Sequence, residues 1–267
     1  MRSAPGRQLL GASFPDDPYL ETAVSAALLR QVARGETPPT VRLNRTGSIL
    51  AFGKLDRLRP GYRQAVALAR AARYAPVERI AGGHAAVFHP GTISLSVAIR
   101  AVGATGAYPG TRDRFAALAD VIATALARTG IDARVGAVDG EYCPGEFSVN
   151  ARGAVKLAGI GQRVVAGGAH VGAVIVVRGA EAVNTALEPV NAALGIDWDP
   201  AATGSVAREL GEDDEPRPAD EPDQLIESTM AALRKELERD TDLQETAPSR
   251  STLDLAERIK DDYRPQV

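Results

Sequence analysis

Apolar residues recur every three or four positions over several parts of the chain, a spacing that places them on one face of a helix. This periodicity predicts helices over 18–35, 60–74, 113–128, 181–194 and 225–237. Pro18 suits the first turn of the first of these helices, and Gly35 marks its end. Pro189 lies inside the fourth, so a kink or a break is expected there.

Alternation of apolar and polar residues predicts strands instead. The run from Ile93 to Ile99 follows a period of two, and a Pro-Gly turn precedes it, so a half-buried strand is expected to pair with 85–88 across that turn. Further extended segments are predicted at 40–53, 146–151, 155–158 and 171–177. Strands and helices neither alternate strictly nor segregate, which indicates an α+β (α/β-like) fold around a mixed sheet.

The sequence changes character after residue 210. Residues 211–224 are acidic and rich in proline, which is typical of a solvated linker. Helical periodicity returns at 225–237, and the remainder holds at most one more short helical patch. We therefore expect a functional domain over 1–210, a linker over 211–224, and a helical, partly disordered appendage over 225–267.

The composition suits a globular chain with a sizeable core, since 45% of the 267 residues are hydrophobic. The formal net charge of −3 offers no electrostatic attraction for nucleic acid or for an anionic membrane surface. The start of the chain lacks the apolar stretch of a signal peptide, and no apolar run is long enough for a membrane helix. A single cysteine excludes an internal disulfide and points to a reducing compartment, so we expect a cytoplasmic protein.

Several common functional motifs fail. The segment 47–54 resembles a phosphate-binding loop, but it has one residue too many between its glycines, and Leu55 stands where a magnesium-binding hydroxyl should follow. The absence of a Gly-x-Ser-x-Gly sequence argues against a serine hydrolase of that class. Three histidines are too few and too unfavourably spaced for a zinc site, so ordinary structural placement is expected for His84, His89 and His170.

Two stretches carry candidate chemistry. In the first, 79–89, the Gly82-Gly83 pair lets a ligand approach backbone amides, although its spacing alone is better explained by a strand-entry turn. In the second, Cys143 comes just before Pro-Gly, at the start of a predicted strand, and Lys156 is expected on a neighbouring strand. A lysine there could favour a thiolate and donate to a substrate carbonyl oxygen. These residues alone leave open whether Cys143 is a nucleophile or a buried structural thiol.

Together the two stretches resemble the lipoate-protein ligase and octanoyltransferase superfamily, which shares its catalytic fold with biotin protein ligases. A first, degenerate block is matched by Arg79, Gly82, Gly83, Val87 and the run 93–96. A second, specific block is matched by Gly153, Lys156, Leu157, Ala158, Gly159, Gln162 and Arg163. The Tyr-Cys-Pro-Gly sequence at 142–145 and the Gly-Gly-x-x-Val sequence at 167–171 most resemble the branch that transfers octanoyl groups from the glycine cleavage H protein to other lipoyl domains. The resemblance extends more loosely from the first helix to about Val206.

The resemblance implies a mixed, mostly antiparallel sheet with packed helices, and an acyl transfer in two steps. Cys143 would attack the acyl carbonyl of a donor, and the resulting thioester would be attacked by the lysine amine of a lipoyl domain. Lys156 would lie near the carbonyl and hold the thiolate or stabilise the oxyanion, and Ile93 or Leu95 would line the acyl tunnel. The implied substrate-binding residues are Arg79, Gly82, Gly83, His84, Gly159 and Gln162.

The same resemblance implies no metal and no nucleotide cofactor. The implied partners are lipoyl-domain proteins, namely H protein and the E2 lipoyl domains of 2-oxoacid dehydrogenases, with acyl carrier protein as a further donor; neither nucleic acid nor membrane is implied. Ala81, His84 and Pro90 depart from the family's pattern and leave acyl-chain length and donor open. Two alternatives remain: an ATP-dependent lipoate-protein ligase, in which Lys156 would contact an acyl-adenylate, and a non-catalytic acyl or lipoyl-domain binding protein.

Overall fold

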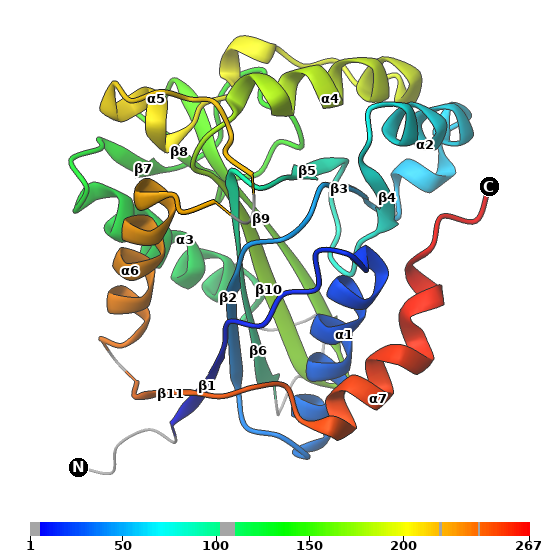
Figure 1. Cartoon of the computed structure of the whole chain (residues 1–267), viewed down its shortest axis with the longest axis vertical. Coiled ribbons are helices and arrows are strands. Elements are labelled where there is room, and N and C mark those ends of the chain that lie inside the picture. The colour runs from blue at the N-terminus through cyan, green and yellow to red at the C-terminus, as the bar shows by residue number, and fades with distance from the viewer. Residues whose placement is uncertain (1–5, 102–109, 219–220, 240) are drawn as a thin grey trace.

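The computed structural model describes residues 6–101, 110–218, 221–239 and 241–267 (Figure 1). Its helices are α1 (Pro18–Arg34), α2 (Tyr62–Ala71), α3 (Thr111–Ala127), α4 (Ala180–Leu194), α5 (Val206–Leu210), α6 (Gln224–Leu237) and α7 (Arg250–Ile259). Its strands are β1 (Arg7–Leu10), β2 (Thr40–Asn44), β3 (Ile49–Phe52), β4 (Ala75–Glu78), β5 (Ala86–Phe88), β6 (Thr92–Ala101), β7 (Ala133–Val135), β8 (Val149–Ala151), β9 (Val155–Val165), β10 (Gly167–Val176) and β11 (Leu243–Glu245).

Most strands form one large mixed sheet in the order β11-β1-β2-β6-β10-β9-β8-β7. Strand β1 runs parallel to both of its neighbours, whereas the remaining pairs in this sheet are antiparallel. A small second sheet has the order β4-β3-β5, with β3 parallel to β4 and antiparallel to β5. The predicted α+β class, with a mixed and mostly antiparallel sheet, is confirmed.

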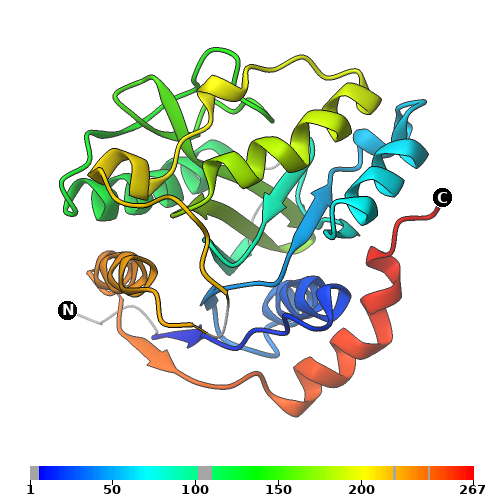
Figure 2. The ribbon, with the colours of Figure 1, turned by 45° about the horizontal axis from the view of Figure 1, so that its top comes forward.

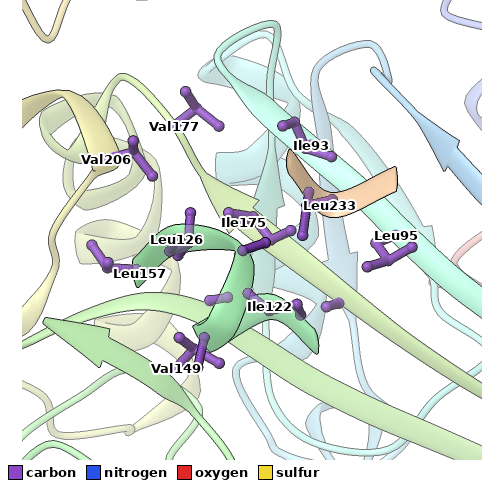
Figure 3. Packing of buried hydrophobic residues seen from close by; sticks show 14 of the residues in the cluster. Ile93, Leu95, Ile122, Leu126, Val149, Leu157, Ile175, Val177, Val206 and Leu233 are labelled. Carbon is purple, nitrogen blue, oxygen red and sulfur yellow. The ribbon is translucent and has the colours of Figure 1, made fainter. Parts of the chain in front are cut away.

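The large sheet is covered on both faces. Helices α3 and α6 pack together on one face, and α1 lies on the other with α7 against it (Figure 2). Alternate residues of the strands face the α3 side, where they form an aliphatic core that includes Ile93, Ile122, Ile175 and Leu233 (Figure 3). Each such fully buried side chain contributes about 1.5–3 kcal/mol on transfer from water.

The predicted pairing across the Pro90-Gly91 turn is wrong. Strand β5 pairs with β3 in the small sheet, whereas β6 lies between β2 and β10 in the large one. The turn is closed by the Thr92 N–H, which donates to the His89 carbonyl, and the carbonyl of Gly91 accepts from the N–H groups of Val177 and Arg178. At this turn the chain passes from the small sheet to the large sheet, because the Gly91 carbonyl is bound by residues beyond the end of β10.

The hairpin of β9 and β10 extends further than its sequence pattern indicates. Strands β9 and β10 form a long hairpin whose alternation is interrupted by glycines, so the periodicity marks only parts of it. Helix α4 spans Ala180–Leu194, close to the predicted 181–194; of the kink or break expected at Pro189, no break occurs.

Elements that follow residue 210 pack against elements that precede it. Leu233 of α6 is buried in the same core as α3, and α7 packs against α1. Strand β11 pairs with β1 at the edge of the large sheet. Across the described ranges, no helix has the length and apolarity needed to cross a membrane.

Replacing Leu233, whose side chain has no exposed surface, tests how far α6 belongs to the main core. We expect Leu233→Ala to lower the free energy of unfolding by about 2–5 kcal/mol, because it leaves a cavity between α6 and α3. Urea unfolding followed by circular dichroism measures this change. Lys235→Ala, on the exposed side of the same helix, is the control. An equal, small effect of both substitutions would show that α6 is only loosely attached.

Candidate active site

Cys143 lies in the long connection between β7 and β8, in a backbone conformation that is unusual for a residue with a side chain. Its φ is 45°, in the left-handed region that favours glycine. The preceding residue fixes this turn, because the ring of Tyr142 is buried and packs edge to face against Trp198. The half-buried Cys143 packs against the same hydrophobic cluster as Tyr142.

Two N–H groups point at the sulfur. The backbone N–H of His84 lies 3.1 Å from Sγ, and the Nη2 of Arg79 lies 3.5 Å from it. The same Nη2 donates to the His84 carbonyl at 2.6 Å, so the guanidinium also braces the turn that presents the amide. Hydrogen-bond donors and a cation in this position can stabilise negative charge on a sulfur atom.

Asp56 anchors the turn that carries these donors. Its fully buried carboxylate lies 2.7 Å from Nδ1 of His84 through Oδ1 and accepts the Gly53 N–H at 2.8 Å through Oδ2. Gly53 packs so closely on the Gly83 carbonyl that a Cβ at residue 53 would lie 1.6 Å from that oxygen. Only glycine fits there, and the close contact sets the position of the His84 amide.

Lys156, on β9, ties the cysteine turn to the sheet. Its side chain is 1% exposed, and Nζ donates to the carbonyls of Tyr142 at 2.8 Å and Cys143 at 2.9 Å. The Glu141 carboxylate lies 3.5 Å away and also accepts from the Gly145 N–H. Burial lowers the pKa of Lys156, and the charge of Glu141 opposes that shift. Its main contacts are with the backbone beside Cys143, rather than with the sulfur itself.

A cavity of about 430 Å³ opens beside the thiol; we call it the Cys143 cavity. Strand β8 pairs with β9 only as far as Ala158. From Gly159 onward, the edge of β9 borders the cavity instead of strand β8. Its wall includes the stacked rings of Phe115 and Phe147, whose centroids are 5.5 Å apart. A hollow with an apolar wall and a nucleophile at its boundary suits a substrate with an apolar chain and a reactive carbonyl.

The described residues contain no group of three or more His, Cys, Asp or Glu placed to hold a metal ion. A family model for the lipoyl protein ligase A/B catalytic domain matches residues 17–249. The chain belongs to this family. The match includes the cysteine turn, the glycine pair and the β9–β10 hairpin, which are the elements that surround the Cys143 cavity.

Two relatives of this family member carry a specific activity in their names. The chain is 30% identical over 171 residues to an octanoyl-[GcvH]:protein N-octanoyltransferase of Geobacillus kaustophilus, which covers 62% of this chain and 57% of that protein. It is 31% identical over 179 residues to the protein of the same name from Anoxybacillus flavithermus, which covers 65% and 60%. The matched regions therefore span less than two thirds of either relative.

Solved structures of lipoate-protein ligases share the fold. A lipoate-protein ligase A bound with ATP superposes with a TM-score of 0.68 and 16% identity, covering 96% of this chain and 94% of that one. A bi-partite lipoate protein ligase from Thermoplasma acidophilum gives a TM-score of 0.66 at 16% identity, covering 96% and 92%. At such identities the likeness concerns the fold alone.

The structure brings most of the predicted site residues of this family member together. Those that border the Cys143 cavity are Cys143, Lys156, Arg79, Gly82, Gly83, Gly159 and Gln162. The main-chain carbonyl of Gln162 accepts the Gly82 N–H at 3.5 Å, and its side-chain amide accepts from Arg114. Gln162 therefore holds the glycine turn and α3 against β9.

The structure differs from the prediction in the role of His84 and in the positions of Ile93 and Leu95. His84 contributes its backbone amide, while its imidazole turns to Asp56. Ile93 and Leu95 pack in the core on the α3 side of the sheet; neither borders the Cys143 cavity, although Leu95 borders a smaller cavity that shares lining residues with it. Sequence reasoning missed Glu141 and Asp56, although Glu141 stands two residues before the cysteine. Nothing in the local pattern marks either as the partner of a distant lysine or histidine.

Adding one methyl group at Gly83 tests the arrangement around the sulfur. Gly83 has a φ of 96°, and a Cβ there would lie 2.4 Å from Nη2 of Arg79 and 2.8 Å from Sγ. We expect Gly83→Ala to displace the donors and slow alkylation of the thiol by iodoacetamide at neutral pH roughly tenfold, because an anionic sulfur would lose the hydrogen bonds that stabilise it. Gly82→Ala is the matched control, since a Cβ at residue 82 meets nothing within 4 Å. Equal rates in the two variants would contradict the assignment of the donors.

Proposed function

We propose that this chain is an acyltransferase that moves an octanoyl or lipoyl group to the lysine of a lipoyl domain through a thioester on Cys143. The observation that carries the proposal is the environment of the Cys143 sulfur. It accepts hydrogen bonds from two N–H groups at the boundary of a cavity with an apolar wall. The family and the names of the two curated relatives support the same reaction class.

In the first step the thiolate of Cys143 attacks the acyl carbonyl of the donor, and a carbon–sulfur bond forms as the carbonyl π electrons move to oxygen. The sulfur then no longer carries the negative charge that the His84 N–H and Arg79 stabilise. These same donors become available to the adjacent oxyanion. When the carbonyl re-forms, the donor's amine or thiol leaves, and a leaving amine takes up a proton.

In the second step the neutral ε-amine of the acceptor lysine attacks the thioester. The new amide forms, the amine gives up a proton, and the thiolate of Cys143 leaves. With an amide donor, one proton is taken up in the first step and one is released in the second. The cycle therefore needs no net proton and no external energy source. Burial of seven chain carbons, at about 0.8 kcal/mol each, can dominate recognition of the acyl group.

The role we propose for Lys156 is to position the nucleophile, because two of its hydrogen bonds go to main-chain carbonyls at the cysteine turn. The partners we propose are lipoyl-domain proteins, with H protein, acyl carrier protein or another acyl thioester as the donor. The reaction requires a reduced thiol, which suits the cytoplasm. No metal or nucleotide takes part in these steps.

Substitution of Cys143 is the decisive test. Purified protein is mixed with octanoylated H protein and an apo lipoyl domain, without ATP, and intact masses are recorded. We expect an octanoyl adduct on Cys143 that passes to the acceptor, and loss of both adduct and transfer in Cys143→Ala. Normal transfer by Cys143→Ala would refute the mechanism. Activity only with ATP and free lipoate would favour a ligase, and binding without any transfer would favour a non-catalytic protein.

Removing the charge of Lys156 tests its positioning role. We expect Lys156→Met to reduce the rate of Cys143 acylation by roughly 100-fold, because the turn loses its anchor and the nucleophile its alignment. Acylation is followed by intact mass, and thermal melting controls for folding. Lys54→Met, at an exposed lysine outside the Cys143 cavity, serves as the charge-matched control. A near-wild-type rate in Lys156→Met would remove the proposed role.

A further inference from the structure

Two leucines are exposed on the short turn between β3 and α2. Leu58 is 79% exposed and Leu55 is 58% exposed, and the only other exposed large hydrophobic residues in the described ranges are Val135 and Val267. The Leu58 N–H donates to the Leu55 carbonyl at 3.2 Å, as in a 3₁₀ turn, where side chains three residues apart lie on the same side. Leu55 and Leu58 therefore form one small apolar surface; we call it the leucine patch.

The turn that carries the leucine patch is fixed at both ends. At its start, the carboxylate of Asp56, which has no exposed surface, accepts the Gly53 N–H at 2.8 Å. At its end, Nη1 of Arg59 donates to the carbonyls of Leu194 at 2.8 Å and Gly195 at 3.1 Å. Exposed apolar surface is unfavourable in water, and an apolar patch on a fixed backbone is typical of a surface that another protein covers.

The two arginines beside the patch already have partners. Arg57 stands between the leucines in the sequence, and its Nη1 lies 3.4 Å from the Glu78 carboxylate. Arg59 is bonded to the two carbonyls at the end of α4. The leucines, rather than these arginines, are therefore left for a partner, which must offer an apolar side chain in return.

The leucine patch lies near the thiol. A Cβ at residue 53 would lie 1.6 Å from the Gly83 carbonyl oxygen, and a Cβ at residue 83 would lie 2.8 Å from Sγ of Cys143. When the covalent bonds between these atoms are added, the Cα of Gly53 lies within about 10 Å of the sulfur. Leu55 follows only two residues later.

The proposed reaction brings a second protein to this place, because an acceptor lysine has to reach the Cys143 sulfur. A standard protein interface covers about 800 Å² on each partner, which corresponds to a disc of roughly 16 Å in radius. A footprint of this size centred on the thiol reaches the leucine patch. Any other protein on the patch, including a second copy of this chain, would stand where the acceptor has to stand.

We propose that the leucine patch is a docking surface for the acceptor lipoyl domain, which places an apolar side chain from beside its lysine on Leu55 and Leu58. The inference rests on the proposed function, since that function requires this acceptor. Docking here also contacts the turn that organises the sulfur's donors, because Asp56 lies between the leucines and 2.7 Å from the His84 ring. Contacts away from the reacting atoms supply the binding energy that holds a substrate in register.

The test separates docking from chemistry by the choice of acceptor. The acyl-enzyme is formed with octanoyl-N-acetylcysteamine, a small thioester that needs no donor protein, and is then mixed with increasing concentrations of apo lipoyl domain. We expect Leu58→Asp to raise the domain concentration for half-maximal transfer roughly tenfold or more, and to leave the maximal rate unchanged. With Nα-acetyl-lysine amide as the acceptor, the parent and Leu58→Asp should react at equal rates.

Val135→Asp is the matched control, because Val135 is 45% exposed and its strand β7 lies across the molecule from α2 (Figure 1). Equal half-maximal concentrations in the parent and Leu58→Asp would overturn the proposal. An equal loss of rate with the small amine would also overturn it, since the patch would then act on the chemistry. A change from dimer to monomer on sedimentation of Leu58→Asp would assign the patch to a second copy of the chain instead.

A binding experiment separates this inference from the proposed function. Calorimetric titration of Cys143→Ala with the apo lipoyl domain requires no thioester. Binding that is roughly tenfold weaker in the Cys143→Ala/Leu58→Asp double variant supports the docking surface even if no thioester forms on Cys143. Equal binding by the two proteins counts against the docking surface, even where Cys143 transfers the acyl group as proposed.

Discussion

One buried ammonium group holds the candidate site together. Lys156 has almost no contact with solvent, and an isolated cation in such a place would be strongly unfavourable. It is stabilised by the Tyr142 and Cys143 carbonyls and by Glu141. Because these partners precede Lys156 by more than a dozen residues, satisfying the charge draws the cysteine turn onto β9. Cys143 has its left-handed backbone conformation within this attached turn.

The other half of the site depends on backbone contact. The turn at residues 82–84 meets Gly53 almost directly, and Asp56 bonds both the Gly53 amide and the His84 ring. The donors at the sulfur therefore come from an amide and a braced guanidinium rather than from a mobile side chain. Such an arrangement is preorganised, since little has to move when charge develops beside the thiol.

Periodicity and motif spacing predicted the elements better than their partners. The helices were visible because their apolar residues recur on one face, and the class followed from the order of elements. That β5 and β6 enter different sheets was not visible, because a local turn does not reveal which carbonyls a distant β10 will bind. Residues of the site came from recognisable blocks, whereas the roles of Asp56 and Glu141 arise only from contacts across the fold.

The parallel strand pair at the sheet edge has a consequence for how the molecule is made. Strand β11 completes the edge beside β1, yet more than 230 residues separate the two along the chain. During synthesis from the N-terminus, β1 can pair with β2 early. The backbone N–H and C=O groups on the other edge of β1 stay unpaired until β11 has been made. Closure over so long a loop is slow, and a waiting strand edge is open to other chains. The earliest vulnerable surface of this protein thus lies at the sheet edge, well removed from its chemistry.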